Sequence, residues 1–166
     1  MVSVAEARWL CAVLGLAVAA CDTGVGPSSP TPAPQGERPA AVAGFDAGPV
    51  RTAAEYLAEP RFAAADIARG ELLSFACAAC HKFKAGEETL IGPNLHGVFG
   101  RRAGAEAGFA YSPALQESGL VWTPVSLEAW LTDPTGFVAG TTMAFSGYRA
   151  PEDRRDLIAY LLSVTQ

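Results

Sequence analysis

The sequence has few aromatic residues, no long apolar run and no excess of basic charge. Aromatic side chains make up 9% of its 166 residues, and twelve Lys or Arg face seventeen Asp or Glu, which gives a net charge of −5. This charge balance argues against a nucleic-acid partner, because such proteins carry a basic surface. A chain with so few large apolar side chains has a small core, so a buried cofactor would help it fold.

Cysteine is also scarce, and its placement does not suggest a disulfide framework. The four cysteines are Cys11, Cys21, Cys77 and Cys80. Cys11 lies inside an apolar stretch and Cys21 ends it, whereas Cys77 and Cys80 are three residues apart and are followed at once by a histidine. No disulfide framework is therefore predicted, and Cys77 and Cys80 belong to a different motif from Cys21.

Residues 1–20 are predicted to be a signal peptide of the lipoprotein type. The uncharged stretch 9–20 follows Arg8 and is shorter than the roughly 20 residues that span a bilayer, but it has the length of a signal-peptide apolar region. It ends in Val-Ala-Ala-Cys, which resembles a bacterial lipobox and predicts cleavage before Cys21 and acylation of its thiol. An ordinary cleaved signal and a short uncleaved anchor remain alternatives. Each sends the chain across a membrane, and the lipobox predicts a lipid-anchored protein on the periplasmic side of a bacterial cell membrane.

Residues 21–61 are predicted to be a flexible tether. The segment is rich in Pro, Ala and Gly and has almost no large apolar residue, so it cannot bury enough surface to fold. About 40 flexible residues give a root-mean-square reach of roughly 35 Å. The part around Tyr56, Leu57 and Phe62 is ambiguous, as linker or as part of the domain. The folded domain is expected to span residues 62–166.

The strongest motif in the chain is Cys77-Ala78-Ala79-Cys80-His81. C-x-x-C-H is the attachment motif of c-type haem. Two thiols one helical turn apart can each form a thioether with one haem vinyl group, and the next residue can direct its imidazole at the iron. A redox-active dithiol would need a βαβ context, which the sequence lacks, and a zinc site would need two more ligands. The motif therefore predicts one covalently attached haem c with His81 as an iron ligand.

A second axial ligand of the haem iron would come from His96 or Met143. Met143 is the only methionine besides Met1, and it lies 62 residues beyond His81. A thioether opposite a histidine raises the reduction potential and suits electron transfer. His96 lies in a loop rich in Gly and Pro. The residues alone leave both candidates open.

From Cys77 to Leu161 the sequence resembles the class I cytochromes c, in particular the mitochondrial type and its soluble bacterial relatives. The resemblance rests on the segments GPNLHGVFGRRAG, GFAYSP, VW, AGTTMAF and RRDLIAYL, which occur in the family's order. It covers about the last 90 residues and says nothing of the N-terminal third. It implies an all-α fold with long loops wrapped around one haem, Met143 as the second axial ligand, and a structural role for His96.

The resemblance also implies roles for individual residues around the haem. The carbonyl of Pro93 would accept a hydrogen bond from the second ring nitrogen of His81 and make the ligand more basic. Phe145 would pack near the exposed haem edge. The haem propionates would be bound by Arg101, Tyr111, Trp122 and Thr141.

Some positions depart from the family's usual residues. Trp130 stands where a tyrosine near the methionine sulfur is usual, and Leu115 replaces an asparagine that helps to bind an internal water. Both changes make the methionine side of the pocket less polar. Thr135, Gly136 and Thr142 occupy positions where the family has lysine, and residues 62–166 carry eight basic and eleven acidic side chains. Steering of partners by a basic ring is therefore not expected.

Three helices can be placed from the apolar spacing and the capping residues. One is expected from about Asp66 to the haem cysteines, with a break in sequence near Gly70 that differs slightly from the family, and a second from Pro124 to near Pro134. A third opens at Pro151 and has a buried stripe formed by Leu157, Ile158, Leu161 and Leu162.

The predicted function is one-electron transfer on the periplasmic side of a membrane. The expected partners are a quinol-oxidising cytochrome complex or a dehydrogenase as donor, and a terminal oxidase or a reaction centre as acceptor, with the bilayer bound through Cys21. The protein would not be an enzyme. The alternative is a small-ligand-binding or peroxidase-like haem protein, which would need an open iron site and a distal acid–base group.

Overall fold

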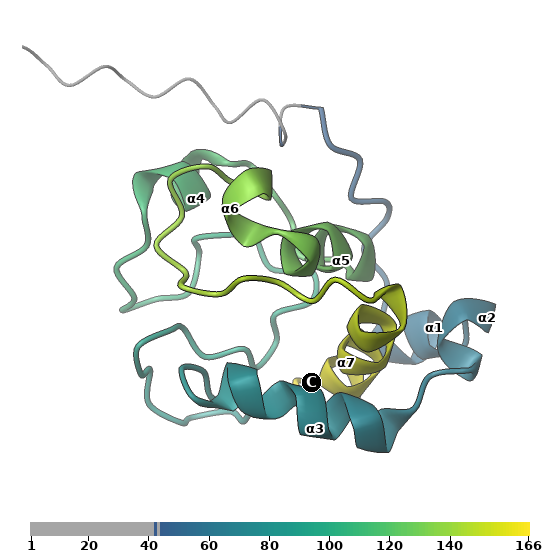
Figure 1. Cartoon of the computed structure of the whole chain (residues 1–166). Helices are drawn as coiled ribbons and strands as arrows, with labels where there is room; N and C mark the ends of the chain where they lie inside the picture. Colours follow the sequence, from purple (N-terminus) through teal and green to yellow (C-terminus); the bar gives the residue numbers. More distant parts are fainter. Residues whose placement is uncertain (1–41, 43) are drawn as a thin grey trace, which may run out of the picture. The chain divides into compact units, whose positions relative to one another are not determined.

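The computed structural model describes residue 42 and residues 44–166 (Figure 1). The predicted signal peptide, the lipidation site Cys21 and residues 22–41 of the tether lie outside this range. In the described part the chain forms seven helices and no strand, apart from one isolated antiparallel bridge between Arg102 and Val121. The expected all-α fold is thus confirmed. None of the described helices is both long and apolar enough to cross a membrane.

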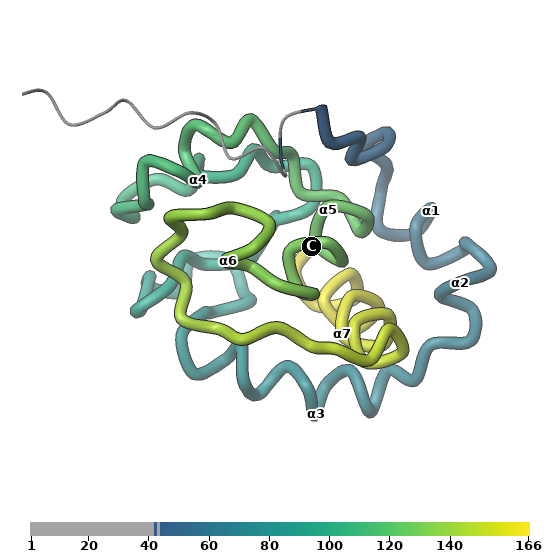
Figure 2. The backbone as a smooth tube through the Cα atoms, turned by 45° about the horizontal axis from the view of Figure 1, so that its top comes forward, coloured from purple at the N-terminus to yellow at the C-terminus, as the bar shows by residue number. Residues whose placement is uncertain are grey.

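Helices α3 (Ile67–Ala78) and α7 (Pro151–Val164) pack against each other across the base of the domain (Figures 1 and 2). The side chain of Asp66 caps α3 by accepting a hydrogen bond from the Arg69 N–H at 3.0 Å. Helix α3 is continuous through Gly70, as expected for one helix from Asp66 to the haem cysteines, although the sequence pattern breaks there. Gly70 instead permits the close approach of α7: a Cβ there would lie 2.7 Å from the backbone carbon of Asp156 and 2.8 Å from Tyr160 Cβ.

The centre of the core is the apolar face of α7. The four residues of the predicted stripe, Leu157, Ile158, Leu161 and Leu162, are at most 3% exposed. They are covered by α3 and by α5 (Pro124–Thr132), which begins at a Thr123 capping box with proline in its first turn, as predicted. The short α6 (Pro134–Phe137) follows directly, with Asp133 as its N-cap.

Residues 44–61 do not behave as a tether in the structure. They include α1 (Ala53–Leu57), and α2 (Pro60–Ala63) follows; both short helices pack against α7. Tyr56 and Phe62 are 4% and 5% exposed and belong to the core. The expected domain boundary at residue 62 is therefore placed too late, because these aromatic side chains supply the apolar surface that the rest of the segment lacks.

Two long stretches without regular structure complete the domain. One joins α3 to α4 (Pro113–Glu117), and the other, residues 138–150, joins α6 to α7. In Figure 2 the second stretch runs as a yellow-green tube from α6 across the domain to the start of α7. These two stretches supply most of the side chains of the candidate site described next.

Candidate functional site

A deep apolar crevice opens between the end of α3, the long loop after it, α5 and residues 141–145. Its volume is about 1310 Å³, including the part open to solvent. The structure brings together around it all eleven site residues that the sequence predicts for the domain: Cys77, Cys80, His81, Pro93, Arg101, Tyr111, Trp122, Trp130, Thr141, Met143 and Phe145. Among the described residues that line it, only Arg101 carries a full charge.

The two thiols and the imidazole come from the last turn of α3. The helix ends at Ala78, and the N–H of His81 still donates to the Cys77 carbonyl at 2.9 Å, so the turn continues to His81. Burial raises the pKa of the Cys77 thiol to about 11, and the neighbouring Cys80 thiol adds to the rise. Burial lowers the pKa of His81, against a smaller opposite effect of its hydrogen bond to Pro93. The imidazole is therefore neutral at neutral pH, which is the form that binds iron.

The orientation of His81 is fixed by Gly92 and Pro93. The His81 Nδ1 lies 2.7 Å from the Pro93 carbonyl oxygen. A carbonyl can only accept, so Nδ1 carries the proton and Nε2 keeps a free lone pair. Gly92 is buried and lies close to the ring: a Cβ there would lie 2.7 Å from Nδ1 and 3.0 Å from Nε2. The hydrogen bond thus orients the ring, and the missing side chain at Gly92 leaves the space that the ring occupies.

Met143 lines the crevice from the segment after α6. Its N–H donates to the Thr141 hydroxyl at 3.3 Å. The pocket wall beside it includes Trp130, 4% exposed, whose ring meets that of Trp122 edge to face at 5.5 Å. His96, the other candidate ligand, does not line the crevice; its N–H donates to the Asn94 side chain at 2.8 Å.

Arg101 connects the crevice to the loop around it. Its guanidinium donates to the carbonyls of Asn94 at 2.7 Å and His96 at 3.2 Å, and it pairs with Glu106. Burial raises the pKa of Tyr111, and the nearby Arg101 charge opposes that rise. A cation and a phenol at the same end of an apolar crevice suit the binding of carboxylates.

Sequence reasoning did not single out several residues that shape the crevice. Gly92 could have been found, since it stands next to Pro93 in the loop that must approach the imidazole closely. Further apolar lining residues carry no local signal of their own; they are Ala76, Ile91, Leu95, Val98, Phe109 and Ala144.

The residues fit a haem better than any other group considered. Two thiols and an imidazole stand in C-x-x-C-H spacing, a thioether lines the same crevice, and the remaining walls are mostly apolar, as a flat macrocycle requires. A structural zinc site would need four N, S or O ligands. In the part of the chain that the structure describes, no three His, Cys, Asp or Glu side chains cluster as such a site would require.

Comparisons with known proteins agree with this fit. A sequence model of the cytochrome c family matches residues 67–165. Cytochrome c of Cochliobolus lunatus is 46% identical over 90 residues, covering 54% of this chain and 83% of its own. Cytochrome c of Chlamydomonas reinhardtii is 45% identical over 103 residues, covering 61% and 92%. The solved structure of cytochrome cH from Methylobacterium extorquens has a TM-score of 0.55 and 44% identity, covering 59% of this chain and 98% of its own.

The family model matches more than half of the chain, and Cys77, Cys80 and His81 of the haem-attachment motif all line the crevice. Residues 42–66, by contrast, precede the part of the chain that the family model matches. The chain belongs to the cytochrome c family as a class I, single-haem electron carrier with covalently attached haem c.

Proposed function

We propose that this protein carries single electrons with a haem attached to Cys77 and Cys80 and ligated by His81 and Met143. The observation that supports the proposal most strongly is that His81 and Met143 line one crevice, while the competing candidate His96 does not. The haem supplies a one-electron iron couple, and the protein supplies orientation, a dry pocket and a tuned potential.

The surrounding residues set the properties of that couple. Donation from His81 Nδ1 to Pro93 makes the imidazole a stronger donor to iron. A thioether ligand favours the reduced iron and raises the potential. Arg101 and Tyr111, with Trp122 and Thr141, bind the propionates, because two carboxylates in an apolar crevice need partners.

The proposed location is the periplasmic face of a bacterial membrane, through an acylated Cys21. The described residues 44–61 pack on the domain, so they do not extend as part of the tether that the sequence predicts. Attachment to the membrane would hold the haem domain near its partners and raise its effective concentration there.

The surface around the crevice supports docking without strong electrostatic steering. Thr135, Gly136 and Thr142, the positions at which the family has lysine, are exposed and uncharged here. Ile91 lines the crevice and is 79% exposed. A neutral, partly apolar rim fits membrane partners such as a quinol-oxidising complex or dehydrogenase as donor and a terminal oxidase or reaction centre as acceptor.

The absorption spectrum of the oxidised holoprotein tests the ligand assignment. A weak long-wavelength band that marks a thioether on ferric haem is expected. A five-coordinate spectrum with ready binding of peroxide would instead support the ligand-binding or peroxidase-like alternative.

The role of the tether is tested with a soluble domain that begins at residue 42, behind an ordinary signal peptide. It should keep the potential of the native protein and deliver electrons to membranes more slowly, with only a weak further loss at high salt. Equal rates with a steep salt dependence would contradict the proposal.

A further inference from the structure

The segment before α1 packs against α6, the helix that precedes the segment carrying Met143. We call the described residues of this segment, 42 and 44–52, the strap. Its first described residue, Val42, is 5% exposed, and the N–H of Phe45 donates to the Val42 carbonyl at 3.2 Å. Phe45 then meets Phe137 of α6 edge to face, with ring centroids 4.9 Å apart. A segment that precedes the family match thus touches the helix that leads into the proposed ligand.

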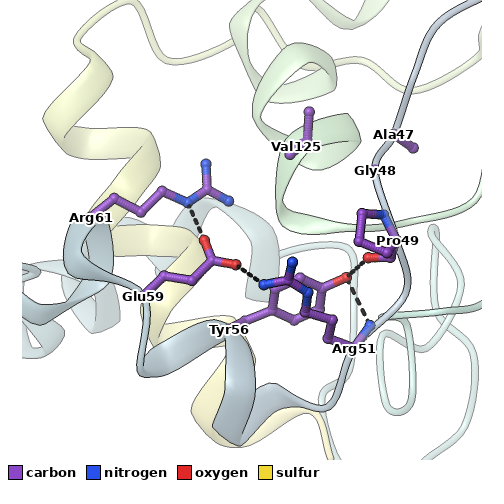
Figure 3. Close-up of a pocket in the computed structure, with 8 residues that line it drawn as sticks. All are labelled: Ala47, Gly48, Pro49, Arg51, Tyr56, Glu59, Arg61 and Val125. Atoms are coloured by element: carbon purple, nitrogen blue, oxygen red, sulfur yellow. Dashed lines mark hydrogen bonds and ion pairs between the residues drawn. The ribbon is translucent and has the colours of Figure 1, made fainter.

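The strap is fastened along its length and not only at Phe45. The buried Thr123 hydroxyl, at the start of α5, donates to the Ala47 carbonyl at 2.6 Å. The Tyr56 hydroxyl donates to the Pro49 carbonyl at 2.7 Å and accepts from the Arg51 N–H at 3.1 Å. Figure 3 shows the two bonds of the Tyr56 hydroxyl, which join the strap to α1. Hydrogen bonds therefore hold the strap at its junction with α1 and at the start of α5.

Ion pairs between charged residues beside the strap provide a second set of contacts. Glu59 pairs with Arg51 at 3.2 Å and with Arg61 at 3.1 Å, as the dashed lines in Figure 3 mark. Arg61 also pairs with Glu128 of α5 at 3.3 Å. These side chains are partly exposed, so each pair contributes little alone, but together they tie the strap to α1, α2 and α5.

Phe137, the residue that Phe45 contacts, ends α6 just before the segment that carries Met143. Phe137 is followed by Val138, which is fully buried, and the Val138 carbonyl accepts from the Thr141 N–H at 3.1 Å. The Thr141 hydroxyl then accepts from the Met143 N–H. Beyond Met143 the segment is held again, since the Tyr148 hydroxyl donates to the Leu73 carbonyl at 2.7 Å. The segment is therefore held on both sides of Met143, and the strap contacts Phe137 on its N-terminal side.

We propose that the strap is a positioning element for Met143, in which Phe45 holds Phe137 and α6 so that the thioether stays on the haem iron against competing ligands. This inference rests on the proposed ligation by Met143. Phe45 does not line the crevice, so it acts through Phe137 and not on the haem. Removing its ring frees α6 to move, which raises the fraction of molecules with an open iron site.

The test uses the full-length ferric holoprotein and imidazole as the competing ligand. Imidazole binds only when the thioether has left, so its apparent affinity reports the open fraction. Phe45→Ala should raise that affinity about three- to tenfold, the range expected for loss of one edge-to-face aromatic contact. It should also weaken the long-wavelength thioether band, and Phe45→Leu, which restores apolar volume but not the aromatic contact, should recover both effects only in part.

Phe62→Ala is the matched control, because it makes the same truncation in the N-terminal segment at a core site that faces α7. It should lower the denaturant midpoint at least as far as Phe45→Ala and change imidazole affinity less than about twofold. Leu57→Ala on α1 gives the same control with a smaller truncation. Affinity that rises in proportion to lost global stability in all of these variants would overturn the positioning role.

A double-variant cycle makes the test more specific. If Phe45 acts through Phe137, adding Phe45→Ala to Phe137→Ala should raise imidazole affinity no further, whereas independent effects would add. Additive effects, or a Phe45→Ala protein with the parent's affinity and band, overturn the inference but leave the ligand assignment intact. A parent holoprotein without the thioether band overturns the ligand assignment and the inference together.

Discussion

Gly92→Ala should disturb the haem ligand His81 directly, and its cost can be worked from the structure. The added Cβ would lie 2.7 Å from His81 Nδ1 and 3.0 Å from Nε2, where ordinary contacts begin at 3.4 Å. The ring must therefore move by several tenths of an ångström or more. Such overpacking costs about 1–3 kcal/mol, and losing the bond from Nδ1 to Pro93 adds about 1 kcal/mol. The more restricted unfolded chain offsets about 0.4–1 kcal/mol, which leaves a net loss of about 1–3.6 kcal/mol.

The reduction potential separates this effect from simple destabilisation. Loss of the Pro93 hydrogen bond weakens the imidazole as a donor and therefore destabilises ferric iron more than ferrous iron. Each tenfold change in the preference between the two oxidation states moves a one-electron potential by about 59 mV. We expect the potential of the Gly92→Ala protein to rise, with a measurable shift in the haem absorption spectrum.

Gly70→Ala is the matched control for this experiment. A Cβ at Gly70 would collide with the Asp156 backbone, so the variant should also lose about 1–3 kcal/mol of stability. Gly70 lies in the packing of α3 on α7 and does not line the crevice, so its potential and spectrum should stay those of the parent. Denaturant unfolding and a redox titration of both variants decide the matter. Equal potentials in all three proteins would refute the role given to Gly92.

Three further outcomes are expected. Met143→Ala should keep its covalent haem, bind carbon monoxide in the ferrous state and have a lower potential; a parent-like spectrum and potential would show that another residue is the ligand. Replacing both Cys77 and Cys80 with Ala should leave no covalent haem and a largely unfolded chain, because haem supplies much of a small core; a helical, cooperatively melting apoprotein would contradict this. Tyr148→Phe should cost about 1 kcal/mol at neutral pH, measured as a difference in unfolding free energy. Burial raises the pKa of Tyr148 above its ordinary value, so this difference should persist up to about pH 10 and shrink as the pH rises through the folded-state pKa; a difference that stays constant to higher pH would refute it.

The haem domain could be predicted closely because its signals are local. Proline and capping residues fix the start of α5, and proline also marks the start of α7. The spacing of Cys77, Cys80 and His81 is set by one helical turn. The role of Gly70, where the sequence pattern breaks, could not be predicted for a physical reason. A glycine weakens an isolated helix, but here the missing side chain is what allows α7 to approach, and that tertiary contact is not visible in the local sequence.

Residues 44–62 show where composition misleads. They average as a polar, Pro- and Ala-rich segment, and such averages predict disorder. Three side chains decide otherwise: Phe45 finds a ring on α6, and Tyr56 and Phe62 enter the core. Each of these contacts joins residues far apart in sequence, so no window along the chain contains both partners. A few such contacts are enough to hold a segment whose polar groups are also hydrogen-bonded. Here the Tyr56 hydroxyl bonds to both Pro49 and Arg51. The aromatic residues in a polar linker are therefore the ones to examine first, since they are the ones that can attach it to a neighbouring domain.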